Sequence, residues 1–247
     1  MKRRAAGLTG RAAGSVPPGA SIAVNVAGEA LTLLAERAIF WAAREALLVA
    51  DLHWGKTETF RAHGIALPDG TLGGDLGRLA SALDRTAARR VIVLGDLVHH
   101  ATGITPALIE QIAAFRRRRA VEFWLVRGNH DKHSIVFPEA WGVRIIEHEL
   151  ADGPFLLRHE PVPAAGRYVW AGHLHPQVRL VGRGDALTLP CFHLGRDVGV
   201  LPAFSEFTGG LLVRRRPGER TFALVEGRVI EVLRPIVDAL TLAVSRS

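Results

Sequence analysis

Runs of histidine, aspartate and asparagine follow apolar stretches at several places in the chain. The tetrapeptide Gly128-Asn129-His130-Asp131 comes directly after the apolar run 123–126. The amide oxygen of Asn129 can bind a hard or borderline cation, and the neighbouring His130 can reach a group bound to that cation. The same arrangement of an apolar run and then ligand-type side chains recurs along the chain, which gives the set Asp51, His53, Asp96, Asn129, His130, Asp131, His159, His173 and His175.

These side chains offer oxygen and nitrogen donors and no thiolate. Carboxylates, imidazoles and one amide suit Mn²⁺, Fe or Zn²⁺ in a reactive centre rather than a sulfur-bound structural zinc. A bridging carboxylate can hold two ions roughly 3.5–4 Å apart, and such a pair activates water and neutralises a phosphate. A histidine beside the ions, such as His130, can protonate the leaving oxygen. The residue types therefore predict two-metal hydrolysis of a phosphoester.

Each of these residues alone could instead be structural, because a single histidine near a core is more often hydrogen-bonded than bound to a metal. Asp51-x-His53 and His173-x-His175 are each weak signals. Their shared position after apolar runs favours the metal interpretation, since ligands of open α/β sheets bind beyond the carboxyl ends of the strands.

Apolar runs predict β-strands before these motifs. The runs 46–50 and 91–95 lack polar alternation, which is typical of strands covered on both faces. Further strands are expected at 22–26, 31–34, 38–41, 121–126, 155–158 and 168–172. Beyond residue 175, short runs separated by Gly and Arg predict a second, more antiparallel sheet, with strands at 178–181, 186–192, 198–204, 211–213, 221–225 and 228–233.

Helical spacing of apolar residues predicts two helices between the strands. They cover 71–88 and 105–119, the second capped by Thr105, and their alternation with strands favours an α/β sheet. The stretch 54–70 is expected to be a long loop. The basic run 116–119 either complements the dipole at a helix end or contacts phosphates.

The length fits one large domain or two small ones, and the absence of an internal repeat and of a clean linker after residue 20 favours one; the composition points to an anionic partner. The 247 residues carry a net charge of +7 and a sequence pI of about 10.8, which points first to nucleic acid. We expect residues 1–20 to form a disordered basic tail and 21–247 a single domain. The single cysteine, Cys191, excludes an intramolecular disulfide, and no apolar run is long enough for a membrane span or a secretory signal. A cytoplasmic location is therefore expected.

The spaced motifs resemble the five signature motifs of the calcineurin-like metallophosphoesterase superfamily. They are Asp51-x-His53, Gly95-Asp96, Gly128-Asn129-His130-Asp131, His159 and Gly172-His173-x-His175. The resemblance implies a four-layer α/β/β/α sandwich around a dinuclear centre. It implies that one ion is held by Asp51, His53 and His175, and the other by Asn129, His159 and His173, with Asp96 as the bridge.

The same resemblance implies roles for the residues next to the ions. His130 would act as general acid or phosphate-binding group, with Asp131 orienting it. One departure concerns His159, which lacks the glycine that precedes this histidine in many members; His148 is the substitute candidate.

A narrower resemblance is to the bacterial ligase-associated DNA damage response endonucleases. It is carried by the segments 36–41, 50–56, 60–61, 64–65, 202–204 and 207–210. It implies cleavage of DNA phosphodiesters, with Mn²⁺ as the first expected metal, single-stranded or structured DNA as the substrate, and DNA-repair ligases or helicases as partners.

Several aromatic and basic residues are candidates for contact with DNA. His99 could position a DNA phosphate, or the His99-His100 pair could have no catalytic role. Trp54, Lys56 and Arg61 are expected to contact substrate, and Trp54 or Phe60 could stack on an unpaired base. Trp54 could equally be a packing residue.

Two other functions remain as alternatives. One is a phosphatase or small-nucleotide phosphodiesterase built on the same site. The other is a non-enzymatic scaffold, which predicts that ligand residues have been lost, whereas all of the motif residues are present in this chain.

Overall fold

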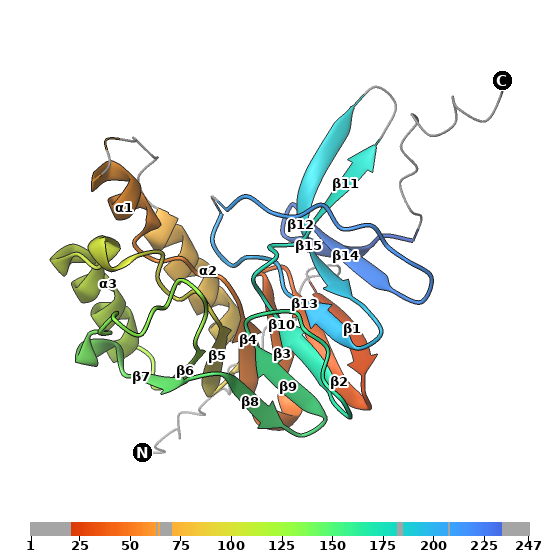
Figure 1. The fold of residues 1–247 in the computed structure, drawn as a ribbon, viewed down its shortest axis with the longest axis horizontal. Coiled ribbons are helices and arrows are strands. Elements are labelled where there is room, and N and C mark those ends of the chain that lie inside the picture. The colour runs from red at the N-terminus through yellow and green to blue at the C-terminus, as the bar shows by residue number, and fades with distance from the viewer. Residues whose placement is uncertain (1–20, 63, 65–70, 182–184, 207, 234–247) are drawn as a thin grey trace, which may run out of the picture.

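Two β-sheets pack face to face, and α-helices cover the outer face of the first (Figure 1). The computed structural model describes residues 21–62, 64, 71–181, 185–206 and 208–233. The expected basic tail, residues 1–20, and the last part of the expected single domain, residues 234–247, lie outside the described residues. None of the helices in the described ranges has both the length and the apolar character needed to cross a membrane.

The first sheet has the strand order β1-β2-β3-β4-β5-β6-β7. Its members are β1 (Ser21–Val26), β2 (Glu29–Leu34), β3 (Ala38–Trp41), β4 (Ala46–Val49), β5 (Arg90–Leu94), β6 (Glu122–Val126) and β7 (Val143–Ile146). Strands β1 to β4 form an antiparallel meander, and β4 to β7 are parallel. The carboxyl ends of β4, β5 and β6 therefore meet at one edge.

The second sheet has the order β15-β14-β12-β13-β10-β9-β8, with β11 paired to β12. Its strands are β8 (Glu149–Asp152), β9 (Phe155–Arg158), β10 (Tyr168–Ala171), β11 (Gln177–Val181), β12 (Ala186–Leu194), β13 (Val198–Val200), β14 (Arg220–Val225) and β15 (Arg228–Glu231). Strands β9, β10 and β13 are parallel neighbours, and the other pairings are antiparallel. This sheet thus begins before residue 175, earlier than predicted, and the expected strand at 211–213 is reduced to an isolated bridge between Gln177 and Leu212.

Both faces of the first sheet are buried. Side chains such as Leu48 and Ile92 point toward the second sheet, where they pack with Trp170 and Phe222. Their alternating neighbours, such as Val93, pack against the helices. This arrangement confirms the prediction of strands covered on both sides, because their unbroken apolar sequence leaves no polar face for water.

Three α-helices lie on the same side of the first sheet (Figure 1). They are α1 (Lys56–Ala62), α2 (Thr71–Thr86) and α3 (Pro106–Arg117), and short 3₁₀ turns occur at η1 (Ala42–Arg44), η2 (Ala101–Gly103) and η3 (Glu139–Trp141). The hydroxyl of Thr105 accepts a hydrogen bond from the backbone of Leu108 at 3.3 Å, as expected for a cap. Helix α1 corrects the prediction of an unbroken loop from 54 to 70; it is short and has a single large apolar residue, so it shows no helical periodicity.

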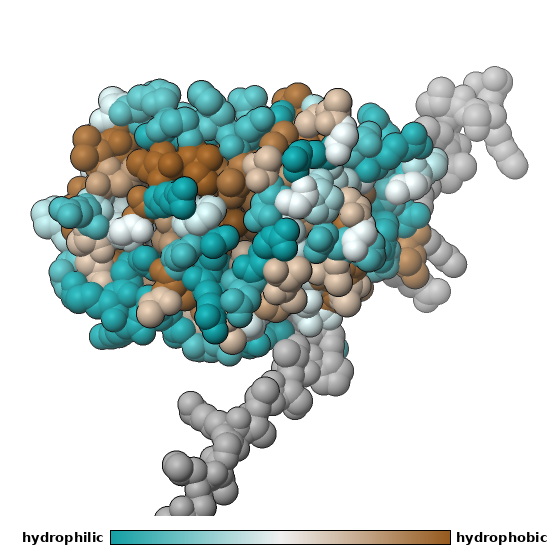
Figure 2. Space-filling model, turned by 90° about the horizontal axis from the view of Figure 1, so that it is seen from below, coloured by the Kyte–Doolittle hydropathy of each residue, from teal (hydrophilic) through white to brown (hydrophobic). Residues whose placement is uncertain are grey.

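The α/β/β part of the predicted sandwich is confirmed, with two mixed sheets. No α-helix follows Arg117 in the described part of the chain, so an outer helical layer over the second sheet is absent from those residues. Figure 2 shows the molecule from below, with a mostly hydrophilic surface and apolar residues gathered in one area on the side of the helices.

The basic run at the end of α3 is held by intramolecular contacts. Arg116 donates to the carbonyl of Trp141 at 2.8 Å, and Arg119 forms two hydrogen bonds with Asp84, at 2.6 and 3.0 Å. Arg117 pairs with Glu110 at 2.6 Å. These contacts favour the structural interpretation of the run over a phosphate-binding patch.

Candidate metal centre

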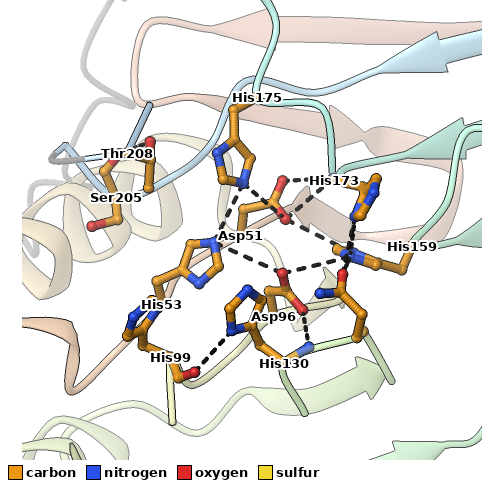
Figure 3. A network of polar contacts seen from close by, with 12 residues as sticks. Asp51, His53, Asp96, His99, His130, His159, His173, His175, Ser205 and Thr208 are labelled. Carbon is orange, nitrogen blue, oxygen red and sulfur yellow. Dashed lines mark hydrogen bonds and ion pairs between the residues drawn. The ribbon is translucent and has the colours of Figure 1, made fainter. Parts of the chain in front are cut away.

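Five strand ends, three from the first sheet and two from the second, meet at one place (Figure 3). The backbone N–H of Asp51, after β4, donates to the carbonyl of Gly95 at 3.1 Å, and that of His53 donates to the carbonyl of Asp96 at 2.9 Å. The carboxylate of Asp51 accepts from the backbone N–H of His173, after β10, at 3.0 and 3.2 Å. Asp51 therefore joins the edges of the two sheets.

One group of donor atoms is formed by Asp51, His53 and His175. The Nε2 atoms of the two histidines lie 3.3 Å apart. Nε2 of His175 lies 3.5 Å from Oδ1 of Asp51. These three residues are the ones that the motif resemblance assigns to the first ion.

A second group lies beside the first and contains Asn129, His159 and His173. Nε2 of His159 is 2.7 Å from Oδ1 of Asn129, and Nδ1 of His173 is 3.0 Å from both of these atoms. His148, the substitute for His159, is exposed and does not belong to any of the donor groups found among the described residues.

Asp96 lies between the two groups. Its Oδ2 is 3.8 Å from Nε2 of His53 and 3.5 Å from Nε2 of His159. Its Oδ1 accepts a hydrogen bond from the backbone N–H of His130 at 2.9 Å. Oδ2 thus lies between one imidazole of each group, where a carboxylate oxygen could contact two ions.

The donor atoms fit divalent cations. Nδ1 of His159 lies 3.0 Å from the carbonyl of Leu94, and Nδ1 of His175 lies 2.8 Å from the carbonyl of Gly209. Because a carbonyl only accepts, both Nδ1 atoms carry the proton and both Nε2 lone pairs face other donor atoms of the site. Metal–ligand bonds of about 2.1 Å at right angles separate two ligands by about 3 Å, which is the spacing found here.

Burial opposes charge on two side chains of the donor set. It lowers the pKa of His53 to about 2, so this imidazole is neutral and keeps a lone pair for a metal. Burial also raises the pKa of Asp96, although the neighbouring His159 opposes that rise. A bound cation would offset the cost of the buried carboxylate charge.

The backbone is strained where the donors sit. Ten non-glycine residues of the described chain have a positive φ, and five of them belong to the donor set: Asp51, His53, Asp96, His173 and His175. Such conformations cost of order 1–3 kcal/mol each and persist where the surrounding structure imposes them, often at functional sites. Here the turns after β4, β5 and β10 point the donor side chains back toward a common centre.

Two glycines of the motifs lie where another residue approaches the backbone too closely for a side chain. A Cβ on Gly95, whose φ is +82°, would lie 2.1 Å from Nδ1 of His159. A Cβ on Gly128 would lie 2.3 Å from Oδ1 of Asp96. Each glycine thus makes room for a donor residue that comes from a different motif.

His130 lies beside the donor groups, but Asp131 does not orient it as expected. Nδ1 of His130 lies 2.9 Å from the carbonyl of His99. The buried carboxylate of Asp131 instead accepts three backbone N–H groups, those of Leu97, Val98 and Gly128, each at 3.1 Å. Asp131 therefore ties the turn after β6 to the turn after β5, because its side chain points away from the His130 ring and into the backbone.

The expected substrate residues differ in their surroundings. Trp54 is 3% exposed and stacks on Phe123 at 5.9 Å, so it is a core residue and cannot stack on a base. Lys56 is half-buried, with Nζ 5.8 Å from the ring centroid of Phe60, and burial lowers its pKa. Arg61 is exposed at the end of α1.

Comparison with known proteins places this site in a family. The family model of the calcineurin-like phosphoesterases matches residues 46–195, more than half of the chain. The chain belongs to the calcineurin-like phosphoesterase family. Together with the buried His and Asp groups, this makes it a metal-dependent phosphoesterase with a site of the dinuclear type.

Two solved structures are similar to this phosphoesterase. The crystal structure of the Pseudomonas putida nuclease MPE is 37% identical, covers 86% of this chain and 100% of its own, and has a TM-score of 0.76. Yfce, a phosphoesterase from E. coli, is 16% identical over 76% of this chain and 97% of its own, with a TM-score of 0.39 that is too low to support an inference. No match is found among the curated proteins.

Backbone carbonyls of this phosphoesterase are part of the site and escaped sequence analysis. Those of Leu94, His99 and Gly209 fix the rings of three histidines. Every residue carries a carbonyl, so residue type gives no signal for them. The segment 202–204 of the narrower resemblance did give a signal: the backbone N–H of Phe204 donates to the carbonyl of Ala50 at 2.8 Å, next to Asp51.

Proposed function

We propose that this phosphoesterase hydrolyses DNA phosphodiester bonds with two divalent cations, Mn²⁺ first, with Fe or Zn²⁺ as alternatives. The observation that carries the proposal is the convergence of seven nitrogen and oxygen donors on two groups around Asp96, with His130 alongside. Similarity to a nuclease at 37% identity over 86% of the chain, together with the net charge of +7, supports DNA as the substrate.

The proposal gives each ion its own set of side chains. Asp51, His53 and His175 hold one ion, and Asn129, His159 and His173 hold the other, with Asp96 between them. When bound, the ions supply charge neutralisation at the phosphate and a water of lowered pKa as the nucleophile. These oxygen and nitrogen donors suit Mn²⁺ without excluding Fe or Zn²⁺.

His130 protonates the leaving group. The carbonyl of His99 keeps a proton on Nδ1 of His130, so Nε2 is the atom that exchanges protons with substrate. As a water that has given up one proton to solvent adds to phosphorus as hydroxide and the ester P–O bond breaks, protonated Nε2 gives its proton to the leaving oxygen. The hydrogen bond from the backbone of His130 to Asp96 holds the turn in place while this happens.

Contacts to the rest of the DNA are proposed for Lys56 and Arg61 on α1 and for His99. The substrate is expected to be single-stranded or structured DNA rather than intact duplex. Repair ligase or helicase partners and a cytoplasmic location stay predictions from sequence.

A substrate panel tests the proposal. The recombinant full chain is incubated with end-labelled single-stranded DNA, duplex DNA, cyclic nucleotides and phosphomonoesters, each with Mn²⁺ and with a chelator. We expect cleavage of DNA that requires the metal. Rapid turnover of monoesters or cyclic nucleotides without DNA cleavage would instead support the phosphatase or small-nucleotide alternative.

An Asp96→Asn variant tests whether Asp96 bridges the two ions. A neutral amide bridges poorly, so the variant should bind both ions more weakly by calorimetry and lose activity on every substrate of the panel. Unchanged stoichiometry and affinity for two ions would contradict the bridging role of Asp96.

A further inference from the structure

Three rings form a column that runs from helix α1 to the proposed proton donor. The rings of Phe60 and His99 are stacked with centroids 5.6 Å apart and planes 21° apart. The rings of His99 and His130 are stacked at 5.1 Å and 20°. His53 packs edge-on against His130 at 5.1 Å and 90°, so the His130 ring is confined on a face and at an edge.

The position of Phe60 in this column is fixed by its helix. Trp54 pairs with Val98 in a parallel bridge, and the backbone N–H of His99 donates to the carbonyl of Trp54 at 3.0 Å. Helix α1 then lies so close to η2 that a Cβ on Gly55 would be 2.6 Å from the carbonyl oxygen of Gly103. The start of α1 is thus tied to the backbone that carries His99, and Phe60 follows one turn later.

The column limits how the imidazole of His130 can turn. Its Nδ1 must donate to the carbonyl of His99, because that oxygen only accepts. Rotation of the His130 ring would break this hydrogen bond unless His99 moved with it, and Phe60 packs on the His99 ring. Stacked aromatic rings prefer an offset, nearly parallel arrangement, so the His99 ring favours one orientation of the His130 ring.

We propose that Phe60 is a positioning residue, which holds His99 against His130 so that Nε2 of His130 faces the substrate. Its effect on the reaction rests on the proposed function of His130, whereas its effect on the orientation of the ring does not. A competing role for Phe60 is stacking on a nucleobase, since this side chain is only half-buried.

Substitutions of Phe60 in the full chain test the proposal. Phe60→Leu removes the ring and keeps apolar volume, Phe60→Trp keeps an aromatic face, and Phe60→Met replaces the leucine variant if that does not fold. Phe115→Leu is the matched control, because Phe115 is also a half-buried phenylalanine on a helix, and it packs against the core beneath the helices and the guanidinium of Arg119.

Two measurements are made on each variant. The first is kcat and KM with Mn²⁺ for a single-stranded oligonucleotide and for an abasic deoxyribose-phosphate oligomer, a diester that lacks bases and keeps an alkoxide leaving group that needs a proton. The second is the ring tautomer of His130 by long-range ¹H–¹⁵N NMR of the metal-free protein, which avoids the paramagnetism of Mn²⁺. The wild type should show the proton of the neutral ring on Nδ1.

If Phe60 positions His99 against His130, Phe60→Leu should lower kcat about tenfold on both diesters with little change in KM. The same variant should give His130 a mixture of tautomers. Phe60→Trp should keep kcat within about twofold, and Phe115→Leu should leave both readouts unchanged. A higher KM for the base-containing DNA alone, with normal kcat on the abasic diester, would establish base stacking and overturn positioning. Unchanged His130 resonances in Phe60→Leu would also overturn it, and this arm is decisive even if the wild type cleaves neither diester and the proposed function fails.

Discussion

Asp96 couples the donor groups to the proposed proton donor. One of its carboxylate oxygens faces the imidazoles of His53 and His159, and the other accepts the backbone N–H of His130 at 2.9 Å. In the proposed site, ion binding and proton transfer would therefore both depend on one side chain. This linkage would place His130 beside the ions without requiring it to bind either of them.

Replacing His130 separates proton transfer from metal binding. His130→Ala should retain both ions, because this ring is not one of the seven proposed ligands, and should lower kcat by a factor of about 10²–10⁴ for the loss of a general acid. Metal content by elemental analysis and kcat on DNA check the two parts. His133→Ala, at an exposed imidazole on the same loop, is the control and should keep its activity. A rate near that of the wild type for His130→Ala would remove the assigned role.

The half-buried position of His99 predicts acid sensitivity of the metal-free fold. Burial, with smaller contributions from His130, lowers the pKa of His99 from 6.5 to about 4. Between these values the unfolded chain binds more protons than the folded one, so the free energy of unfolding falls as the pH falls from about 6.5 toward 4 and gains nothing from this group above 6.5.

The measurement is denaturant unfolding with a chelator at several pH values between 4 and 7.5. His99→Asn removes the titrating ring, so its free energy of unfolding should fall less steeply with acid than that of the wild type. Equal slopes for the two proteins would show that His99 does not contribute to the acid sensitivity.

At this scale the sequence revealed the donors because their side chains are chemically distinctive. Asp51, Asp96 and Asn129 can be recognised by type and by position after an apolar run. The role of Asp131 could not be assigned in this way, since a carboxylate that accepts three backbone N–H groups has the same sequence signature as one that orients an imidazole.

Helix α1 is stabilised by tertiary contacts, and its sequence alone carries no helical pattern. Seven residues make two turns, which are marginal in isolation. The helix is supported by its contact with η2, where Gly55 and Gly103 approach each other, and by the hydrogen bond from the Thr59 hydroxyl to the Gly55 carbonyl at 2.9 Å. Such long-range contacts leave no periodicity in the sequence, which is why this segment was expected to be a loop.

A pair of glycine substitutions tests this contact. In Gly103→Ala the new Cβ would lie 2.3 Å from the carbonyl oxygen of Gly55, so α1 must shift, and we expect a loss of about 1–3 kcal/mol of stability and a lower kcat. Gly74→Ala, in α2, is the control, because its Cβ meets nothing within 4 Å and alanine is the better helix former by about 0.5–1 kcal/mol. Chemical denaturation and kcat measure both effects, and equal stability of the two variants would contradict the close contact.

Two edge strands are further elements that the sequence did not predict. The core strands β4 and β5 were evident because they are apolar throughout, whereas β7 and β8 were not predicted. Residues 143–146 and 149–152 are half-exposed and carry charged residues such as Arg144 and Glu149, so their sequence gives little apolar signal. They become strands because β6 and β9 offer unpaired edges.

In the whole molecule, the site lies where the two sheets meet. Asp51, Asp96 and Asn129 follow strands of the first sheet, and His159 and His173 follow strands of the second. The sequence predicted two sheets but placed the start of the second after residue 175, because β9 and β10 have the same buried, apolar character as strands of the first. Which sheet a buried strand joins depends on pairing across the fold, and the local pattern does not contain that information.

This arrangement predicts that the ions stabilise the junction of the sheets more than their outer edges. Binding to the folded state alone stabilises it by RT ln(1 + [L]/Kd), about 2.7 kcal/mol per site at a hundredfold excess over Kd. Saturating Mn²⁺ should therefore raise Tm, and Asp96→Asn should lose most of that rise.

Hydrogen exchange shows where in the molecule this stabilisation acts. Amides of 51–53 and 172–175 should exchange more slowly with metal than with chelator, because both turns carry donors, whereas those of β14 and β15 at the far edge of the second sheet should not change. Equal protection at both places would show that metal binding acts on global unfolding and not on the junction.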